Sequence, residues 1–528
     1  MKIVSLPNEM LHDIARQLSP RWTEAYLAKE NNSSLEATAK SRRDDLVALI
    51  KVNRKFRHIA TEHLYRSIRI TDNVSLGMLA RTLVKKESRG AMVRHLHLTN
   101  THFGVAGEND ARIVMALLKT VQKKYPKVDS AIRRHLAQGA AVDPNALRPH
   151  TAALACALVL CLSPGLRVWR VDKQQESNEP WDLCWRICRS FADEPPEPAS
   201  ADEPKPPKPF GSIKSLLTQG HPEFFNLVEI FVPGSLANVT LTMGGFRGIE
   251  QVETGFDRNP GRWKDLTGLR LLDAHISGDW FYSMCKKEFK SLESIDIRAD
   301  CPSVVVHEGA PPEMRVDPGF NDAFALRAGT LKSLRFTPCR NRLSWKVYLG
   351  ADQRLSCLPS LVHVTHLHVP LTALFALPEE IEEMSLCDLL PPNVEYVDID
   401  AQFDCNWYIW EHIVLNPYDE MPAPSFLDQC SGEHQRLVRA KVSQLAEHCA
   451  AKLPRLMQAA FVVDNLPDVF MPNQWPGRKW PEGLWVEPAK PEDKKGFIYL
   501  LPPHSIELRE GKRKEVRAAI KDSSPEGW

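Results

Sequence analysis

The sequence predicts an α/β protein, in which a short helical module at the amino end precedes a long array of alternating strands and helices. Within the first 70 residues, apolar side chains recur at helical spacing in three separate stretches. From residue 71 onward, the frame apolar-x-x-apolar-x-apolar recurs, with helix-like stretches between its copies. Repeated strand-and-helix units are typical of a solenoid, in which each unit covers its neighbour.

The first helix of the amino-terminal module is expected to begin near Pro7, because the first turn tolerates a residue without an N–H group. Leu11, Ile14 and Leu18 then follow at i, i+3 and i+7 and form one apolar stripe. Two more short stripes follow, Leu46/Leu49/Ile50 and Phe56/Ile59/Ala60/Leu64. Three short helices make a poor self-contained core, so their apolar residues need another surface in this chain or on a partner.

The order of these residues resembles the F-box family. The matching features are Leu6-Pro7 with Glu9 two residues on, the apolar stripe, a Leu-x-x-Leu helix and the segment 52–60, where Phe56 takes a position that is usually Trp. The match covers residues 4–68, and we assign residues 1–70 to this module. A long polar insert at residues 19–43 replaces the family's short connection, which a loop can accommodate at small entropic cost.

The resemblance implies that the module binds the adaptor subunit of an SCF-type cullin-RING ubiquitin ligase, and through it the cullin. The residues that match the family's apolar contact positions are Leu6, Pro7, Leu11, Ile14, Val52 and Phe56. An alternative is that the same helices cap the array and bind nothing.

The array is assigned to residues 71–470. Copies of the frame are expected to be strands: Leu166/Trp169/Val171, Leu227/Ile230/Val232, Leu269/Leu272/Ala274, Leu292/Ile295/Ile297, Leu331/Leu334/Phe336, Val364/Leu367/Val369 and Val394/Val397/Ile399, with a further strand at 93–99 and a last one at 456–463. Helices are expected over residues 71–86, 149–162, 181–191, 279–289 and 435–453. Such frames also arise by chance. The prediction of strands therefore depends on the turn residues that flank several copies and on the Pro or Asp that ends them.

This array resembles the irregular leucine-rich-repeat-like regions that follow many F-boxes, especially in filamentous fungi. It lacks the Asn/Cys position of regular repeats, and an ordinary α/β domain with a few parallel strands is the alternative. By resemblance, the chain is the non-catalytic substrate receptor of the ligase, and its array holds an unidentified target protein. A leucine-rich-repeat-like interaction scaffold is the second interpretation.

Two segments of the array region differ in composition from the rest. Residues 194–209 are rich in Pro and polar side chains and are expected to be a linker without a packed core. Residues 471–528 form a Trp/Pro-rich tail, in which Trp475, Trp480 and Trp485 recur in sequence that suits neither helix nor strand. We expect these Trp side chains to pack over the end of the array, and the alternative is that they present an aromatic surface.

Histidines provide the best lead to an enzyme. His363, His366 and His368 lie within ten residues, and on a strand His366 and His368 share one face. With a third ligand they could hold a metal, which gives a metal-assisted hydrolase as a lesser alternative. His95 and His97 repeat the pattern, so we favour polar residues on a target-facing surface. No phosphate loop, Gly-x-Ser-x-Gly or His-Glu-x-x-His motif occurs, and neither catalysis nor a cofactor is expected.

The composition limits the partners and the compartment. A net charge of +1 disfavours nucleic acid as the main partner. Twelve cysteines without a Cys-x-x-Cys pair indicate free thiols in a reducing compartment. The amino end leads into a charged helix rather than a signal peptide, and the longest apolar run, at 152–162, is about half a bilayer crossing. We therefore expect no membrane contact, and the cytoplasm or the nucleus as location.

Overall fold

A computed structural model describes most elements of the array and the three helices of the module. The described residues are 7–19, 33–99, 151–171, 184, 186–190, 210, 212–219, 235–242, 249–272, 276–298, 319–337, 354–375, 380–402, 424–464, 484–487 and 495–500. The chain divides into two compact units, Met1–Gly244 with Thr254–Leu266 and Gly245–Glu253 with Thr267–Trp528. The described part is mixed α/β and is built on parallel strands.

The amino-terminal module consists of helices α1 (Asn8–Leu18), α3 (Ser33–Val52) and α4 (Arg54–Arg66). Helix α4 begins at a side-chain cap, because Oδ1 of Asn53 accepts a hydrogen bond from the N–H of Phe56 at 2.9 Å. The prediction that the polar insert at residues 19–43 is a loop is wrong in part. Helix α3 already begins at Ser33, so the second half of that segment extends the predicted helix toward its amino end.

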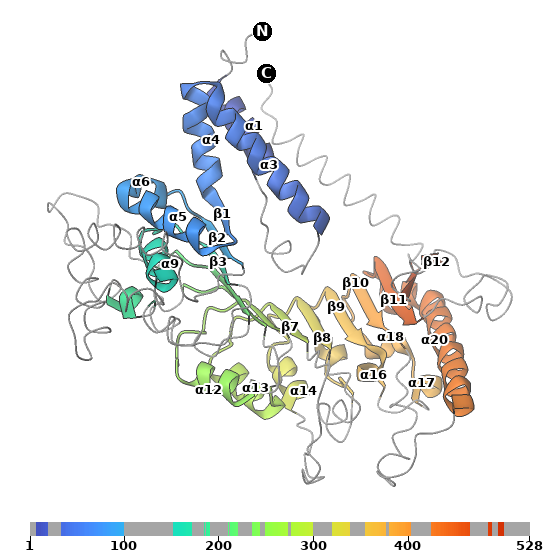
Figure 1. Cartoon of the computed structure of the whole chain (residues 1–528). Coiled ribbons are helices and arrows are strands. Elements are labelled where there is room, and N and C mark those ends of the chain that lie inside the picture. The colour runs from blue at the N-terminus through green and yellow to red at the C-terminus, as the bar shows by residue number, and fades with distance from the viewer. Residues whose placement is uncertain are drawn as a thin grey trace, which may run out of the picture. The chain divides into compact units, whose positions relative to one another are not determined.

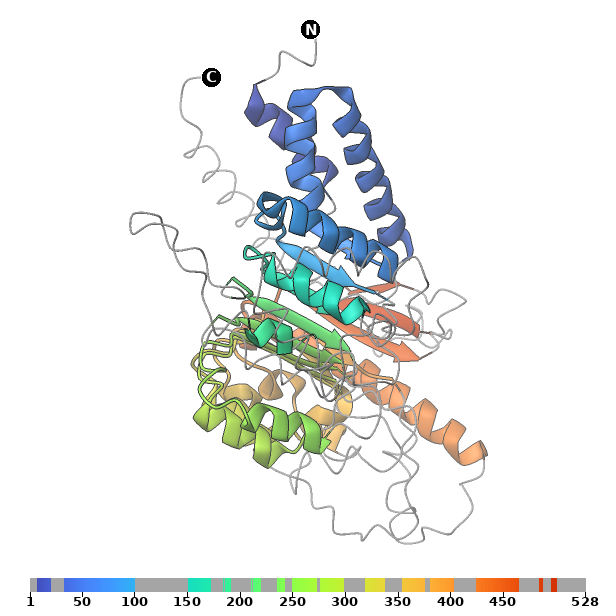
Figure 2. The same ribbon diagram turned by 60° about the vertical axis from the view of Figure 1, so that its left-hand side comes forward.

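In the first unit, five parallel strands follow one another in chain order from β1 to β5. They are β1 (Ser67–Ile70), β2 (His95–Leu98), β3 (Val168–Val171), β4 (Ser215–Gln219) and β5 (Asn238–Thr242). Helices α5 (Asn73–Lys85) and α9 (Thr151–Cys161) lie side by side next to β1–β3 (Figures 1 and 2), and the short α6 (Glu87–Gly90) follows α5. All eleven residues of α9 are buried.

In the second unit, strands β6 to β11 are parallel and again follow chain order. The strands are β6 (Gly268–Leu272), β7 (Ser294–Arg298), β8 (Ser333–Thr337), β9 (His366–Pro370), β10 (Tyr396–Asp400) and β11 (Gln458–Asp464). Helices α13 (Gly278–Lys287), α14 (Gly319–Leu326), α16 (Leu371–Leu374) and α18 (Leu386–Leu389) lie on one side of these strands (Figure 1). The other elements are α12 (Ile249–Asp257), at the division between the units, a 3-10 turn (Leu358–Ser360), α17 (Glu380–Glu383) and α20 (Pro424–Lys452).

The apolar frame marks the inner side of the strands. Leu292, which precedes β7, and Ile295 and Ile297 within it are at most 2% exposed, and the last two share one side of the strand. The frame is confirmed in the same way at β2, β3, β8, β9 and β10. At β6 the predicted frame is shifted, because the buried residues are Leu266, Leu269 and Leu271.

Other sequence predictions for the array meet mixed outcomes. The predicted helices at 71–86, 149–162, 279–289 and 435–453 correspond to α5, α9, α13 and α20. Strands β1, β4 and β5 were not predicted. Some predictions lie outside the described residues: the frame at Leu227, the linker 194–209, and Trp475 and Trp480 of the tail. The predicted helix at 181–191 lies partly outside them.

The carboxyl-terminal prediction is wrong in part. Within residues 471–528, strands β12 (Leu484–Glu487) and β13 (Lys495–Leu500) extend the sheet, and β13 pairs antiparallel with both β11 and β12. Ile498 and Leu500 are fully buried, so apolar alternation in β13 supplies the strand signal that the Trp/Pro content obscured.

Two further findings concern the expected compartment. The nine described cysteines are free thiols, and all of them are buried. Among the described residues, no helix combines the length and the apolar character that a membrane crossing requires.

Candidate interaction surfaces

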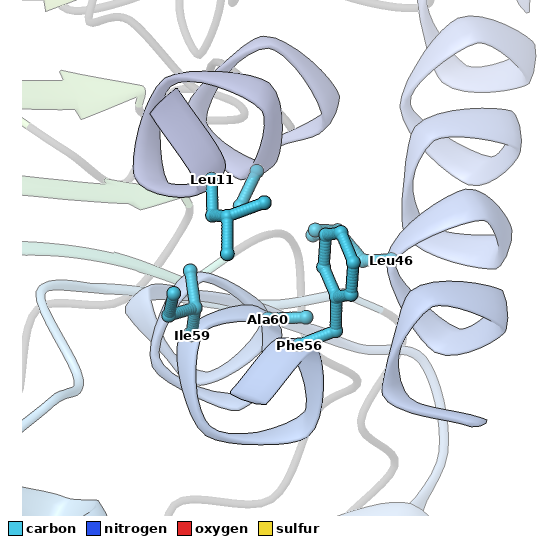
Figure 3. Packing of buried hydrophobic residues seen from close by; sticks show 6 residues of the cluster. Leu11, Leu46, Phe56, Ile59 and Ala60 are labelled. Carbon is cyan, nitrogen blue, oxygen red and sulfur yellow. The ribbon is translucent and has the colours of Figure 1, made fainter. Parts of the chain in front are cut away.

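The three helices of the module pack around a small core of their own. Leu11 of α1, Leu46 of α3 and Phe56, Ile59 and Ala60 of α4 point toward one another (Figure 3), and each is at most 3% exposed. The expectation that Leu11 and Phe56 contact a partner is therefore corrected. Their side chains hold the module together, because three helices of this length have few other apolar residues with which to form a core.

A second group of apolar side chains in the module faces outward. Met10 is 50%, Ile14 37% and Val52 58% exposed, and Pro7 is exposed as well. We call these four residues the exposed apolar set. On α1, Leu11 and Ala15 share the buried side at a spacing of four, and Met10 and Ile14 repeat this spacing one residue earlier.

The exposed apolar set therefore contains three of the predicted contact residues, Pro7, Ile14 and Val52. Leu6 lies outside the described residues. Sequence reasoning missed Met10, although its spacing of four residues from Ile14 was the available signal.

The histidines of β2 do not form the expected target-facing surface. His97 is 7% exposed, which corrects its assignment to a surface. His95 is half-buried, and burial followed by the nearby Arg66, Arg167 and Arg94 lowers its pKa to about 4. His97 therefore belongs to the interior of the first unit, and His95 is only partly accessible.

A row of cations marks the edge of the first unit where its strands begin. This row consists of the residues that directly precede β1 to β4, which are Arg66, Arg94, Arg167 and Lys214. Each of the last three donates a backbone N–H to the carbonyl of the residue before it in the row. The corresponding row of the second unit is charge-compensated: Lys332 pairs with Glu293 at 2.9 Å, and Arg455 with Glu395 at 3.0 Å.

In the second unit, a charged row crosses the strands on the side opposite the apolar frame. It consists of Arg270, Asp296, Arg335, His368 and Asp398, one residue from each of β6 to β10, which are aligned by the register of the sheet. The expectation that His366 and His368 share an outward face agrees with this register, because the buried Leu367 stands between them.

His366 and His368 make contacts that are typical of a protein surface. The ring of His366 stacks on Tyr396 with centroids 4.8 Å apart, and Nδ1 of His368 lies 3.8 Å from Oδ2 of Asp398. His363 is exposed in the turn before β9. Within the described part of the chain, no group of three or more His, Cys, Asp or Glu side chains is arranged to hold a metal ion. The structure thus does not assemble the three histidines into a set of ligands.

Comparison of the chain with models of protein families and with curated protein sequences finds no match.

Proposed function

We propose that this chain is the substrate-recognition subunit of an SCF-type cullin-RING ubiquitin ligase. In this proposal the three-helix module is an F-box that binds the adaptor subunit, and the strands form an irregular leucine-rich-repeat-like solenoid that holds a target protein. The chain has no catalytic residues of its own. It accelerates ubiquitin transfer by raising the effective concentration of the target near the loaded enzyme.

The observation that carries this proposal is the division of apolar side chains in the module. The segment whose residue order resembles an F-box folds into three helices with a separate core, and the exposed apolar set remains outside that core. Fully burying an exposed apolar side chain contributes roughly 1.5–3 kcal/mol, and covering Met10, Ile14 and Val52, which are 50%, 37% and 58% exposed, contributes about half of that for each. Association costs about 4–15 kcal/mol. The set therefore contributes a substantial part of the required free energy, and losing two members should abolish tight binding.

The parallel strands support the target-binding half of the proposal. In each unit the strands follow chain order, and helices lie in several of the described connections between them. This arrangement leaves one side of the sheet of the second unit to polar side chains, among them His366 and His368. A row of charged and aromatic side chains at the spacing of adjacent strands suits recognition of a protein surface.

The test is co-purification of the full chain with the SCF adaptor subunit. The wild-type chain should form a salt-resistant 1:1 complex, because the contact is apolar. The double variant Ile14→Glu/Val52→Glu should lose the complex, since it places two charges in the contact. The matched control is Val74→Glu/Met78→Glu, which changes two exposed apolar residues of α5 outside the module and should bind as the wild type does. A wild-type chain that does not bind the adaptor would refute the proposal.

A second interpretation, that the module is a structural cap on an interaction scaffold, has one observation in its favour. Helix α4 ends at Arg66 and β1 begins at Ser67, so no connecting residue separates the module from the first strand. A cap predicts that both double variants leave the partners of the chain unchanged. It also predicts that deleting residues 1–66 makes the rest of the chain insoluble.

A further inference from the structure

Strand β8 carries two buried polar atoms that have no hydrogen-bond partner. They are Nε of Arg335 and Oγ1 of Thr337. Because the two residues are two positions apart on a strand, their side chains lie on the same side of the sheet. Buried donors are nearly always paired in folded proteins, so two such atoms on one side of one strand need an explanation.

The neighbouring strand does not supply the missing acceptors. Asp296 of β7 is 7% exposed, and its carboxylate already binds two other arginines. Its Oδ2 accepts from Nε of Arg270 at 3.0 Å and from Nη2 of Arg298 at 2.7 Å, and its Oδ1 accepts from Nε of Arg298 at 2.8 Å. Nε of Arg335 remains 3.9 Å from Oδ1, which is too far for a hydrogen bond.

The local charge is therefore positive. Three guanidinium groups surround the single buried carboxylate of Asp296. Asp398 of β10 also acts on Arg335, but its side chain is 56% exposed and lies near His368. Burial and then the adjacent Arg298 lower the pKa of Arg335, and the carboxylates of Asp296 and Asp398 offset this lowering only in part.

This arrangement is unfavourable unless an anion is bound. Removing a charged group from water without a complete set of partners is unfavourable, and so is placing like charges together. An anion that accepts hydrogen bonds from these groups would remove both penalties. A dissolved anion can reach these arginines, because the side chains of Arg335 and Arg298 are 38% and 28% exposed.

We propose that Arg298, Arg335 and Thr337 form a binding site for an oxyanion, a carboxylate or a phosphate group, on the polar side of β7 and β8. The Arg335 guanidinium supplies forked N–H donors that match the geometry of either oxyanion. Arg298, whose Nε and Nη2 already bind Asp296, adds its remaining N–H groups. The Thr337 hydroxyl supplies a third donor. The site does not depend on the proposed function, because its support comes from the unpaired donors and the local charge alone.

The experiment measures thermal unfolding of the full chain in sodium phosphate and in sodium acetate, each against sodium chloride at equal ionic strength and pH. A ligand that binds the folded state raises the unfolding midpoint with a saturable dependence on concentration. The wild-type chain should show such a rise in at least one of the two salts. A rise in phosphate alone assigns the site to phosphate groups, and a rise in acetate alone assigns it to carboxylates.

Three variants complete the test. Arg335→Gln should lose at least nine-tenths of the rise in unfolding midpoint. In chloride it should unfold at a higher temperature than the wild type, because the substitution removes an incompletely paired charge. Thr337→Val keeps the size of the side chain and should reduce the rise. Lys332→Gln removes a cation that is already paired with Glu293, and should respond as the wild type does. Absence of a rise in both salts, or a full rise in Arg335→Gln, would overturn the proposal.

Discussion

Nδ1 of His63 lies 2.9 Å from Oγ of Ser19, and this hydrogen bond joins the end of α1 to α4 across 44 residues of sequence. The Ser19 hydroxyl donates its only proton to the carbonyl of Ala15 at 2.8 Å. It must therefore accept from His63, which assigns the proton of the neutral ring to Nδ1. Burial lowers the pKa of His63, so the neutral form is favoured in the folded module.

Replacing Ser19 should destabilise the module by leaving this buried donor unpaired. We expect Ser19→Ala to lower the free energy of unfolding of the first unit by about 1–3 kcal/mol. The measurement is urea denaturation of the full chain, followed by a probe in the first unit. Ser41→Ala, at an exposed position of α3, is the control and should have little effect. Equal effects of the two substitutions would show that the Ser19–His63 hydrogen bond contributes nothing.

Leu11 and Ile14 should respond differently to truncation, although both lie on the apolar stripe of α1. Leu11 is fully buried, so Leu11→Ala is expected to cost about 2–5 kcal/mol in the free energy of unfolding. Ile14 is 37% exposed, and Ile14→Ala should cost much less. Urea titration of both variants checks the difference. A cost for Ile14→Ala as large as that for Leu11→Ala would mean that Ile14 belongs to the core.

This pair shows what the helical stripe could and could not predict. Spacing identifies which side chains of α1 are apolar and on which side they lie. It does not separate the part of the stripe that faces α4 from the part that remains exposed, because that depends on how the three helices pack. Met10 was missed for the same reason, since the rotation of α1 about its axis decides its exposure.

The strands show a similar division. Frames with three aliphatic or aromatic residues, such as Leu331, Leu334 and Phe336, are found as strands because burial on the inner side requires that spacing. Strand β4 was missed because Thr218 takes the third position after Ile213 and Leu216. The charged row could not be predicted, because Arg270, Asp296 and Arg335 meet only through the register of three strands that are far apart in sequence.

Protonation of His95 should make the stability of the first unit depend on pH. Its folded pKa of about 4 is depressed mainly by burial and also by three neighbouring arginines. The reference value in an unfolded chain is about 6.5. As pH falls below about 6.5, the unfolded chain takes up the proton first, so stability is lost between about pH 6.5 and 4 and then levels off. The loss is roughly 3 kcal/mol at about 1.36 kcal/mol per unit.

The measurement compares unfolding free energies of the wild-type chain and His95→Gln across this pH range. His63, whose pKa is also lowered by burial, is present in both proteins, so the difference between the two curves isolates His95. The variant should lose less stability than the wild type between pH 6.5 and 4. Parallel curves would show that His95 is not held neutral by its surroundings.

Gly319, the first residue of α14, should not tolerate a side chain. A Cβ atom there would lie 2.3 Å from the carbonyl carbon and 2.4 Å from the carbonyl oxygen of Gly278, which begins α13. The two helices share an aromatic contact between Phe281 and Phe320, with centroids 5.8 Å apart, so backbone separation would also disturb this packing. Gly319→Ala is expected to cost about 1–3 kcal/mol, as overpacked core substitutions do.

Gly329 is the matched control for this substitution. Apart from Gly329 and its two chain neighbours, no residue has a heavy atom within 4 Å of the position that its Cβ would occupy, so Gly329→Ala should leave the free energy of unfolding nearly unchanged or raise it by up to about 1 kcal/mol. Urea titrations of both variants should therefore give a lower midpoint for Gly319→Ala alone. If the two variants unfold at the same midpoint, helices α13 and α14 do not meet through their first residues. The close approach of Gly278 and Gly319 would then be excluded as a source of stability in the second unit.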